Sequence, residues 1–177
     1  MQFRKPKGIK EFFEIKRLYK KAFPKCERKP FSLIMQWYKE GNSDIWYFCD
    51  EKGFLGFSTT INGEREILID YFTVSEKHRG KGHGTNMIKA LIDHYAPKGV
   101  FLEIEMLDER AENYAQRVRR RKFYLSAGLE PLNTYAKLFG TDMEILGVRC
   151  SMDYDKYCNF YLENYGKFAY DNITAVG

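Results

Sequence analysis

The stretch Arg79-Gly80-Lys81-Gly82-His83-Gly84 combines glycines and cations in a pattern that suits a phosphate. An apolar, β-prone run precedes it at 67–74, and apolar residues recur at helical spacing over 87–95. The pattern predicts a strand that passes through a glycine-rich turn into a helix. Such a turn exposes backbone N–H groups at a helix N-terminus, where the helix dipole favours anions. The sequence therefore predicts a phosphorylated ligand at this turn.

The elements around this turn alternate between helical and β patterns. Periodicity and turn signals favour a parallel pair of strands on either side of the helix that follows the turn. Asn62-Gly63 predicts a tight type I′ turn, and Gly128 is expected just after a helix. In chain order we expect helices at 9–22 and around 33–38, strands at 44–50, 54–61 and 66–74, a helix at 84–95, a strand at 100–106, a helix at 111–126, and strands at 135–139 and 143–148.

These elements predict an α/β (α+β) fold in a single domain. We expect a mixed, mostly antiparallel sheet of six to seven strands flanked by about four helices. No linker or repeat interrupts the order, so the domain is expected to cover 1–177, with a core at 9–150 and an extension at 151–177. The tail at 153–168 is rich in aromatic residues and predicts a helix that packs on the domain or on a second subunit, so a homodimer is possible.

Composition restricts the class of protein. The chain has 44% hydrophobic and 30% charged residues, as in a water-soluble globular protein, and no apolar run could span a bilayer. Its formal charge of +5 suits an anionic ligand without requiring nucleic acid. The four cysteines are scattered, which predicts reduced thiols and no metal site. We expect a cytoplasmic protein with no nucleic-acid or membrane partner.

Two motifs together resemble the GNAT superfamily of acyl-coenzyme A-dependent N-acetyltransferases. The signature Q/R-x-x-G-x-G/A is met by Arg79, Gly82 and Gly84, and Y-x-x-x-G-F is met by Tyr124 and Gly128, with Leu129 in place of Phe. The resemblance covers 54–150 and includes the order of the elements. It implies a GNAT-like fold and an enzyme that uses acetyl-CoA as cosubstrate.

The resemblance also implies where acetyl-CoA binds. The pantetheine arm would pair with the backbone of a bulged strand segment, where one N–H polarises the thioester carbonyl. The turn would hold the pyrophosphate, with glycines that permit close approach. His83 departs from the apolar residue usual there. The implied binding residues are Phe72, Thr73 and Val74 on the strand and Arg79, Gly80, Lys81, Gly82, His83, Gly84 and Thr85 at the turn.

By the same resemblance, Tyr124 is the candidate general acid for the departing thiolate; alternatively, it is a tyrosine packed against the sheet. The attacking amine must be neutral, which requires a base or a water chain. Asp70 on the strand before the turn is a candidate base or cation-binding residue, and Glu103 and Glu105, on one face of the next strand, are candidate bases. Alternatively, these carboxylates belong to a solvated face of an outer strand.

The basic run 117–122 has three interpretations. It is a solvated helix face, a set of ligands for the coenzyme A phosphates through Arg117 and Arg120, or a nucleic-acid patch. The third interpretation lacks the second basic element that nucleic-acid surfaces usually have.

In this family the loop between the first two helices and the last hairpin form the acceptor pocket, so Glu27 and Tyr135 are candidate substrate contacts. The predicted acceptor is a primary amine, favoured as part of a small molecule. A protein or peptide acceptor, a non-catalytic acyl-CoA sensor and a basic interaction module are the alternatives.

Overall fold

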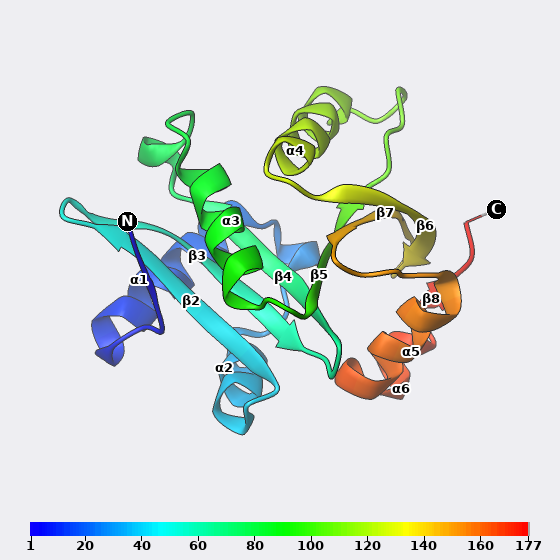
Figure 1. The fold of residues 1–177 in the computed structure, drawn as a ribbon, viewed down its shortest axis with the longest axis horizontal. Helices are drawn as coiled ribbons and strands as arrows, with labels where there is room; N and C mark the ends of the chain where they lie inside the picture. The colour runs from blue at the N-terminus through cyan, green and yellow to red at the C-terminus, as the bar shows by residue number, and fades with distance from the viewer. Residues whose placement is uncertain (177) are drawn as a thin grey trace. The chain divides into compact units, whose positions relative to one another are not determined.

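The computed structural model describes residues 1–176 and divides into two compact units. The first unit comprises residues 1–62 and 69–91, and the second comprises 63–68 and the chain from Ile92 onward. Strand β4 (Glu66–Val74) contributes residues to both units. The strand order is β1-β2-β3-β4-β5-β7-β6-β8 (Figure 1). Each unit is described in turn.

The first unit carries the N-terminal strands and three α-helices. Strand β2 pairs antiparallel with both β1 and β3. Two 3₁₀ turns mark the loops: η1 lies between the first two helices, and η2 precedes the glycine turn. The elements are β1 (Gln2–Arg4), α1 (Gly8–Ala22), η1 (Lys25–Glu27), α2 (Phe31–Glu40), β2 (Ser43–Asp50), β3 (Gly53–Asn62), η2 (Glu76–His78) and α3 (His83–His94), whose last residues belong to the second unit.

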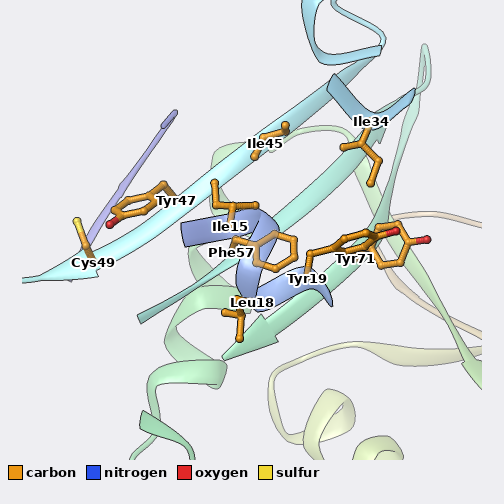
Figure 2. Close-up of a cluster of buried hydrophobic side chains, with 9 residues drawn as sticks. All are labelled: Ile15, Leu18, Tyr19, Ile34, Ile45, Tyr47, Cys49, Phe57 and Tyr71. Atoms are coloured by element: carbon orange, nitrogen blue, oxygen red, sulfur yellow. The ribbon is translucent and has the colours of Figure 1, made fainter. Parts of the chain in front are cut away.

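Helices α1 and α2 cover one face of β2, β3 and β4 (Figure 2). Apolar side chains from the helices and strands pack there in one buried cluster, in which Phe57 is fully buried. The neighbouring Gly56 faces the other way, because a Cβ atom there would lie 3.0 Å from the end of Met87 in α3. The cluster comprises Ile15, Leu18, Tyr19, Ile34, Ile45, Tyr47, Cys49, Phe57 and Tyr71.

The second unit carries the start of β4 and the C-terminal strands. The parallel ladder between β4 and β5 consists of the pairs Glu66–Gly99, Ile67–Val100 and Leu68–Phe101. Strand β5 also pairs antiparallel with β7, which pairs with β6, and β6 pairs with β8. The elements are β5 (Gly99–Glu105), α4 (Tyr114–Ser126), β6 (Glu130–Leu138), β7 (Thr141–Val148), α5 (Tyr154–Tyr165), α6 (Lys167–Tyr170) and β8 (Ile173–Thr174).

The aromatic tail packs within the second unit. Its predicted helix is α5, in which Tyr157 and Tyr161 are buried. The ring of Phe160 meets that of Phe101 in β5 edge to face, with 4.9 Å between centroids. Buried aromatic area therefore holds α5 against its own chain.

The mixed, mostly antiparallel α/β fold is confirmed, with some differences in detail. The described residues form six α-helices, where about four flanking helices and a C-terminal helix were expected. Within the described residues the sheet has eight strands rather than six or seven, because β1 and β8 are three and two residues long, too short for periodicity to detect. The expected type I′ turn at Asn62-Gly63 is wrong, since neither residue has the positive φ that it requires. Gly63 instead packs against Phe160, whose ring would lie 2.6 Å from an added Cβ atom.

Some element boundaries also differ from those expected from the sequence. Helix α4 begins at Tyr114 and β6 at Glu130, whereas Gly128 follows α4 with φ +103°, as expected. All four cysteines are free thiols. Every helix within residues 1–176 is too short or too polar to cross a membrane. The single-domain assignment stays a prediction.

Candidate functional site

The glycine turn lies in the first unit, directly before α3. Gly80 and Gly82 have φ of +71° and +78°, a backbone conformation that L side chains rarely adopt. Within residues 1–176, and apart from each glycine and its two chain neighbours, no heavy atom lies within 4 Å of where their Cβ atoms would be. The turn is therefore open, and its N–H groups add to the positive end of the α3 dipole. This geometry suits a phosphate group.

The side chains of the turn are held at its rim. The Arg79 guanidinium donates to the Val74 carbonyl at 3.0 Å, which ties the turn to the end of β4. The Lys81 ammonium donates to the Lys77 carbonyl at 3.1 Å and is exposed. His83 and Thr85 are half-buried in the first turn of α3. The turn thus combines an open backbone with two exposed cationic side chains.

The end of β4 carries the segment expected to hold the pantetheine arm. Phe72 and Val74 are half-buried and Thr73 is buried, which is the alternation of an ordinary strand. The Ser58 hydroxyl donates to the Tyr71 carbonyl at 2.9 Å and so anchors the start of this segment. The expected β-bulge stays a prediction.

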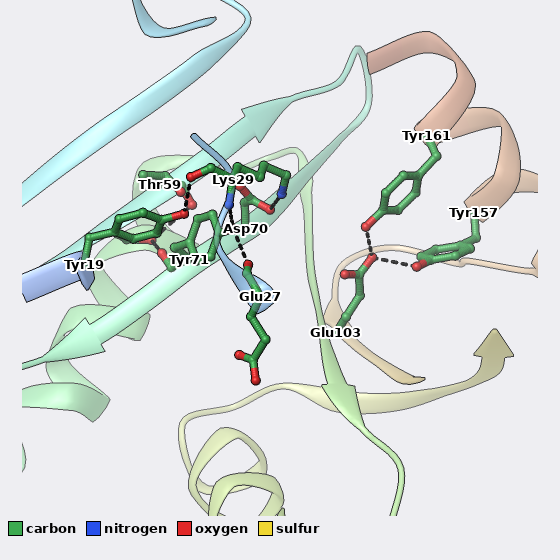
Figure 3. A network of polar contacts seen from close by, with 10 residues as sticks. Tyr19, Glu27, Lys29, Thr59, Asp70, Tyr71, Glu103, Tyr157 and Tyr161 are labelled. Carbon is green, nitrogen blue, oxygen red and sulfur yellow. Dashed lines mark hydrogen bonds and ion pairs between the residues drawn. The ribbon is translucent and has the colours of Figure 1, made fainter. Parts of the chain in front are cut away.

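Asp70, a candidate base, lies in an ion pair. The Lys29 ammonium is 2.6 Å from Asp70 Oδ1, and the Asp70 side chain is 9% exposed. The same ammonium lies 5.0 Å from the ring centroid of Tyr71 (Figure 3). The Lys29 ammonium thus already occupies an oxygen of this nearly buried carboxylate, which argues for a structural role of Asp70.

Backbone contacts tie the loop between α1 and α2 to β4. The Tyr71 hydroxyl donates to the Glu27 carbonyl at 2.8 Å and accepts from the Lys29 N–H at 3.1 Å. The Tyr19 hydroxyl donates to the Lys29 carbonyl at 2.9 Å. Burial raises the pKa of Tyr71 to about 12, so its hydroxyl stays protonated. The exposed Glu27 carboxylate points away from this cluster (Figure 3).

Tyr124 lies in the last turn of α4, in the second unit. Its side chain is half-buried, with the ring centroid 4.9 Å from that of Phe123. Burial raises the pKa of Tyr124 to about 12, against a smaller lowering by Arg120. The phenol therefore keeps its proton at neutral pH, as a hydrogen-bond donor to a thiolate requires.

Glu103 accepts hydrogen bonds from two buried phenols. The hydroxyls of Tyr157 and Tyr161 donate to Glu103 Oε1 at 2.8 and 2.7 Å, and the other carboxylate oxygen points away from the two tyrosines (Figure 3). Burial, followed by the Glu103 charge, raises the pKa of both phenols well above the usual range. The phenols thus stay neutral and orient the carboxylate.

Glu105, two residues along β5, lies between two guanidinium groups. Arg117 and Arg120 each approach one of its oxygens at 2.9 Å. Asn113 donates to the same carboxylate at 3.3 Å, and Arg117 also donates to the Met106 carbonyl at 2.7 Å. The two expected phosphate ligands therefore share one carboxylate and retain an excess of one positive charge.

A third charged contact fixes α4 on the sheet. The Arg121 guanidinium binds Glu144 of β7 in a fork, with its closest contact at 2.8 Å, and the Glu144 side chain is 6% exposed. Hydrogen bonding by Glu144 raises the pKa of Arg121. Tyr135 lies opposite Glu144 in the β6–β7 ladder and is largely exposed. The helix that carries Tyr124 is thereby anchored next to its C-terminal turn.

The sequence did not reveal the partners of these carboxylates. Lys29 pairs with Asp70, and Tyr157 and Tyr161 donate to Glu103, across long separations in the chain. The aromatic tail was the only signal for the second group. Among residues 1–176, no group of three or more His, Cys, Asp or Glu side chains could hold a metal ion.

Comparisons with known proteins agree with this fold. The family model for the acetyltransferase (GNAT) family matches residues 12–119. No curated protein is significantly similar in sequence. Among solved structures, a GNAT-family acetyltransferase from Bacteroides thetaiotaomicron is 18% identical with a TM-score of 0.76, over 94% of this chain and 99% of that one.

Two further solved structures share the fold at low sequence identity. A chimera of spermidine N-acetyltransferase SpeG from Vibrio cholerae with hSSAT is 14% identical with a TM-score of 0.62, over 84% of this chain and 96% of that one. An aminoglycoside 6′-N-acetyltransferase complexed with coenzyme A is 12% identical with a TM-score of 0.65, over the same shares of the two chains. The family match covers more than half of the chain, and the chain therefore belongs to the acetyltransferase (GNAT) family.

Proposed function

We propose that this protein transfers the acetyl group of acetyl-CoA directly to a primary amine. The observation that carries the proposal is the open turn at Gly80 and Gly82, where a backbone cradle at the N-terminus of α3 fits a pyrophosphate. Membership of an acetyltransferase family supports it, as does the coenzyme A complex of a protein with the same fold. Acetyl-CoA supplies the activated acyl group.

The chain's own residues are assigned to binding this donor. Backbone N–H groups of residues 80–85 bind the pyrophosphate, while the side chains of Arg79 and Lys81 add positive charge at the rim. The Arg79 N–H is not among them, because it donates to the Glu76 carbonyl at 3.1 Å. The backbone of residues 72–74 pairs with the pantetheine amides and offers one N–H to the thioester carbonyl. Arg117 and Arg120 contribute their remaining positive charge to the phosphates.

Tyr124 is assigned to stabilise the leaving thiolate of coenzyme A. Its raised pKa, about 12, keeps the phenol protonated throughout the neutral range. A coenzyme A thiol resembles a cysteine thiol, with a pKa of about 8.5, so the phenol stabilises the thiolate as a hydrogen-bond donor before the proton equilibrates with solvent. Catalysis by Tyr124 is therefore substantial without being indispensable.

Glu103 is the candidate base best suited by its contacts. Asp70 pairs with an ammonium and Glu105 with two guanidiniums, so cations already occupy the oxygens of these carboxylates. The identified donors to Glu103 are neutral phenols. We assign Glu103 to accept the amine proton, directly or through water, and Asp70 and Glu105 to positioning.

The acceptor is assigned only as a primary amine. Proteins of the same fold act on spermidine and on aminoglycosides, which makes small amines one candidate class. Peptide amines are the other class, and the charge distribution of α1 favours them. Glu27 and Tyr135 remain candidate acceptor contacts.

The turn assignment is tested by adding a methyl group to the cradle. Gly82→Ala should weaken coenzyme A binding about tenfold or more in isothermal titration, because Cβ occupies the space needed for close approach of phosphate. Gly53→Ala is the matched control: it has φ +113° in the β2–β3 turn and equally open surroundings. Equal coenzyme A affinity in the two variants would refute this assignment.

A further inference from the structure

The excess positive charge of the chain is concentrated in α1 and the loop that follows it. Residues 8–30 contain eight Lys and Arg side chains and three Glu side chains. This excess of five equals the formal net charge of the whole chain, +5. The remaining residues are therefore balanced in net charge, and this segment carries the net positive excess of the chain.

The solvent-exposed side chains of α1 are all apolar or cationic. Ile9 is 90% exposed and Phe13 is 66% exposed, and Lys16 and Lys20 continue their line at helical spacing. Both glutamates of the helix are engaged elsewhere: Arg4 binds Glu11 in a fork, and Glu14 accepts from the Tyr47 hydroxyl at 2.7 Å. We call the exposed side chains Ile9, Lys10, Phe13, Lys16, Arg17, Lys20 and Lys25 the α1 surface.

Most of the cations of the α1 surface are available to a partner. Among the described residues, Lys10, Arg17, Lys20 and Lys25 have no carboxylate within ion-pair distance. Lys16 lies over the Phe31 ring at 5.7 Å, a contact that leaves its charge exposed. The nearby Lys21 is already paired with Glu76 at 2.7 Å and is not counted. Charge complementarity therefore requires an acidic partner.

The α1 surface ends beside the proposed reaction centre of the first unit. Tyr19, in the last part of α1, holds the Lys29 carbonyl, while Lys29 and Tyr71 tie the loop to β4 at Asp70. Residues 70 and 71 directly precede the segment 72–74 assigned to the thioester. A chain lying along α1 would thus be guided toward this end of β4.

We propose that the α1 surface binds an acidic peptide segment of the acceptor, whose amine is acetylated; this inference rests on the proposed function. Lys10 to Lys20 spans about 15 Å of helix at 1.5 Å per residue, which matches about five extended peptide residues and exceeds the length of most small amines. The same cations repel polycations such as spermidine and aminoglycosides.

The apolar residues favour a peptide over other polyanions. Exposed Ile9 and Phe13 are the kind of side chains that anchor protein interfaces, with cations at the rim. Insertion into an anionic bilayer would need a continuous apolar face, but the inner face of α1 is buried against the sheet. Duplex DNA offers charge without an apolar site for these two side chains.

The test compares three peptides of about ten residues, a length that covers the α1 surface with margin. They share a free N-terminus, one lysine and one leucine, and differ in having glutamate, glutamine or arginine at all other positions. Thiol release and mass spectrometry measure acetylation at saturating acetyl-CoA. We expect kcat/KM to be about tenfold or more higher for the glutamate peptide than for the glutamine peptide, and lowest for the arginine peptide.

Variants locate the effect on the α1 surface. Lys16→Glu/Lys20→Glu should remove the preference for glutamate, and Phe13→Ser should lower kcat/KM for all three peptides. Lys39→Glu/Lys52→Glu is the control with the same change in net charge, because both lysines are exposed outside this surface. This control should keep most of the preference.

Three outcomes would overturn the inference: a preference for the glutamine or arginine peptide, no acetylation of any peptide, or equal effects of the two double variants. Tighter binding of duplex DNA or of phosphatidylglycerol vesicles, dependent on Lys16 and Lys20, would also overturn it. Coenzyme A titration separates the two proposals. If coenzyme A binds and the glutamate peptide is not preferred, only this inference fails; if coenzyme A does not bind, the proposed function fails.

Discussion

Glu103 and Glu105 lie two residues apart on one face of β5, yet they have different partners. Two neutral phenols hold Glu103 by hydrogen bonds, whereas two guanidiniums hold Glu105 by ion pairs. Guanidiniums offset the charge of a carboxylate with their own, whereas neutral phenols orient a carboxylate without adding positive charge. Two glutamates with equivalent positions in the sequence pattern thus have different surroundings, which suit different roles.

The largest expected effect is a difference in kcat between variants of Glu103 and Glu105. Glu103→Gln should lower kcat about 100-fold, the usual contribution of a general base, because an amide cannot accept the amine proton. The isosteric Glu105→Gln should lower kcat only a few-fold, since Glu105 positions Arg117 and Arg120. Initial rates of thiol release measure both. Equal losses of kcat in the two variants would contradict the assignment of Glu103 as base and Glu105 as positioning residue.

The ion pair between Arg121 and Glu144 should contribute measurably to the free energy of unfolding. Arg121→Met leaves the nearly buried Glu144 without its fork and should cost about 3 kcal/mol of unfolding free energy. Urea unfolding measures this cost. Adding Glu144→Gln should recover part of the loss, because the unpaired buried charge disappears. A change below about 0.5 kcal/mol, typical of surface sites, would show that the fork is not structural.

Removing one of the phenol hydrogen bonds to Glu103 should cause a smaller loss of stability. Tyr157→Phe or Tyr161→Phe removes one hydrogen bond to a charged acceptor and should lower the free energy of unfolding by about 1.5 kcal/mol. Each variant should also lower kcat, since Glu103 loses one orienting contact. Tyr170→Phe, on an exposed tyrosine, serves as the control in both measurements. Loss of stability with unchanged kcat would make the phenols purely structural.

The smallest effect concerns a guanidinium-held carboxylate on the first unit. Hydrogen bonds from Arg4 lower the pKa of Glu11 from 4.5 to about 2. Because the folded-state pKa is depressed, the stabilisation is present above pH 4.5 and is lost as the pH falls toward 2. The melting temperatures of wild type and Glu11→Gln should therefore converge over that range. A constant difference would contradict the lowered pKa.

The sequence predicted the elements that local patterns specify. Glycines and helical spacing located the turn at 79–84, and alternation located the strands around it. The short strands β1 and β8 escaped detection because two or three residues show no period. The type I′ turn predicted at Gly63 was wrong, because the small size of this residue allows close contact with Phe160 and does not indicate a tight turn.

The candidate site was predictable in its residue types and not in their pairing. Glu103 meets Tyr157 and Tyr161 more than fifty residues further along the chain, and Asp70 meets Lys29 some forty residues before it. Such contacts arise from tertiary packing, which no spacing rule encodes. The pairing decides which of the three carboxylates is held by cations and which by neutral phenols, so the sequence could supply the candidate bases but could not choose among them.

The central claim is direct acetyl transfer to an amine with Tyr124 assisting the leaving thiolate. The most direct measurement is a single-turnover reaction in which thiol release and acetylated amine are followed together, in wild type and Tyr124→Phe. We predict one thiol per acetylated amine, with transfer slowed about 100-fold in the variant and acetyl-CoA affinity unchanged. Thiol release without acetylated amine, or a variant that loses acetyl-CoA affinity while keeping its transfer rate, would contradict the account.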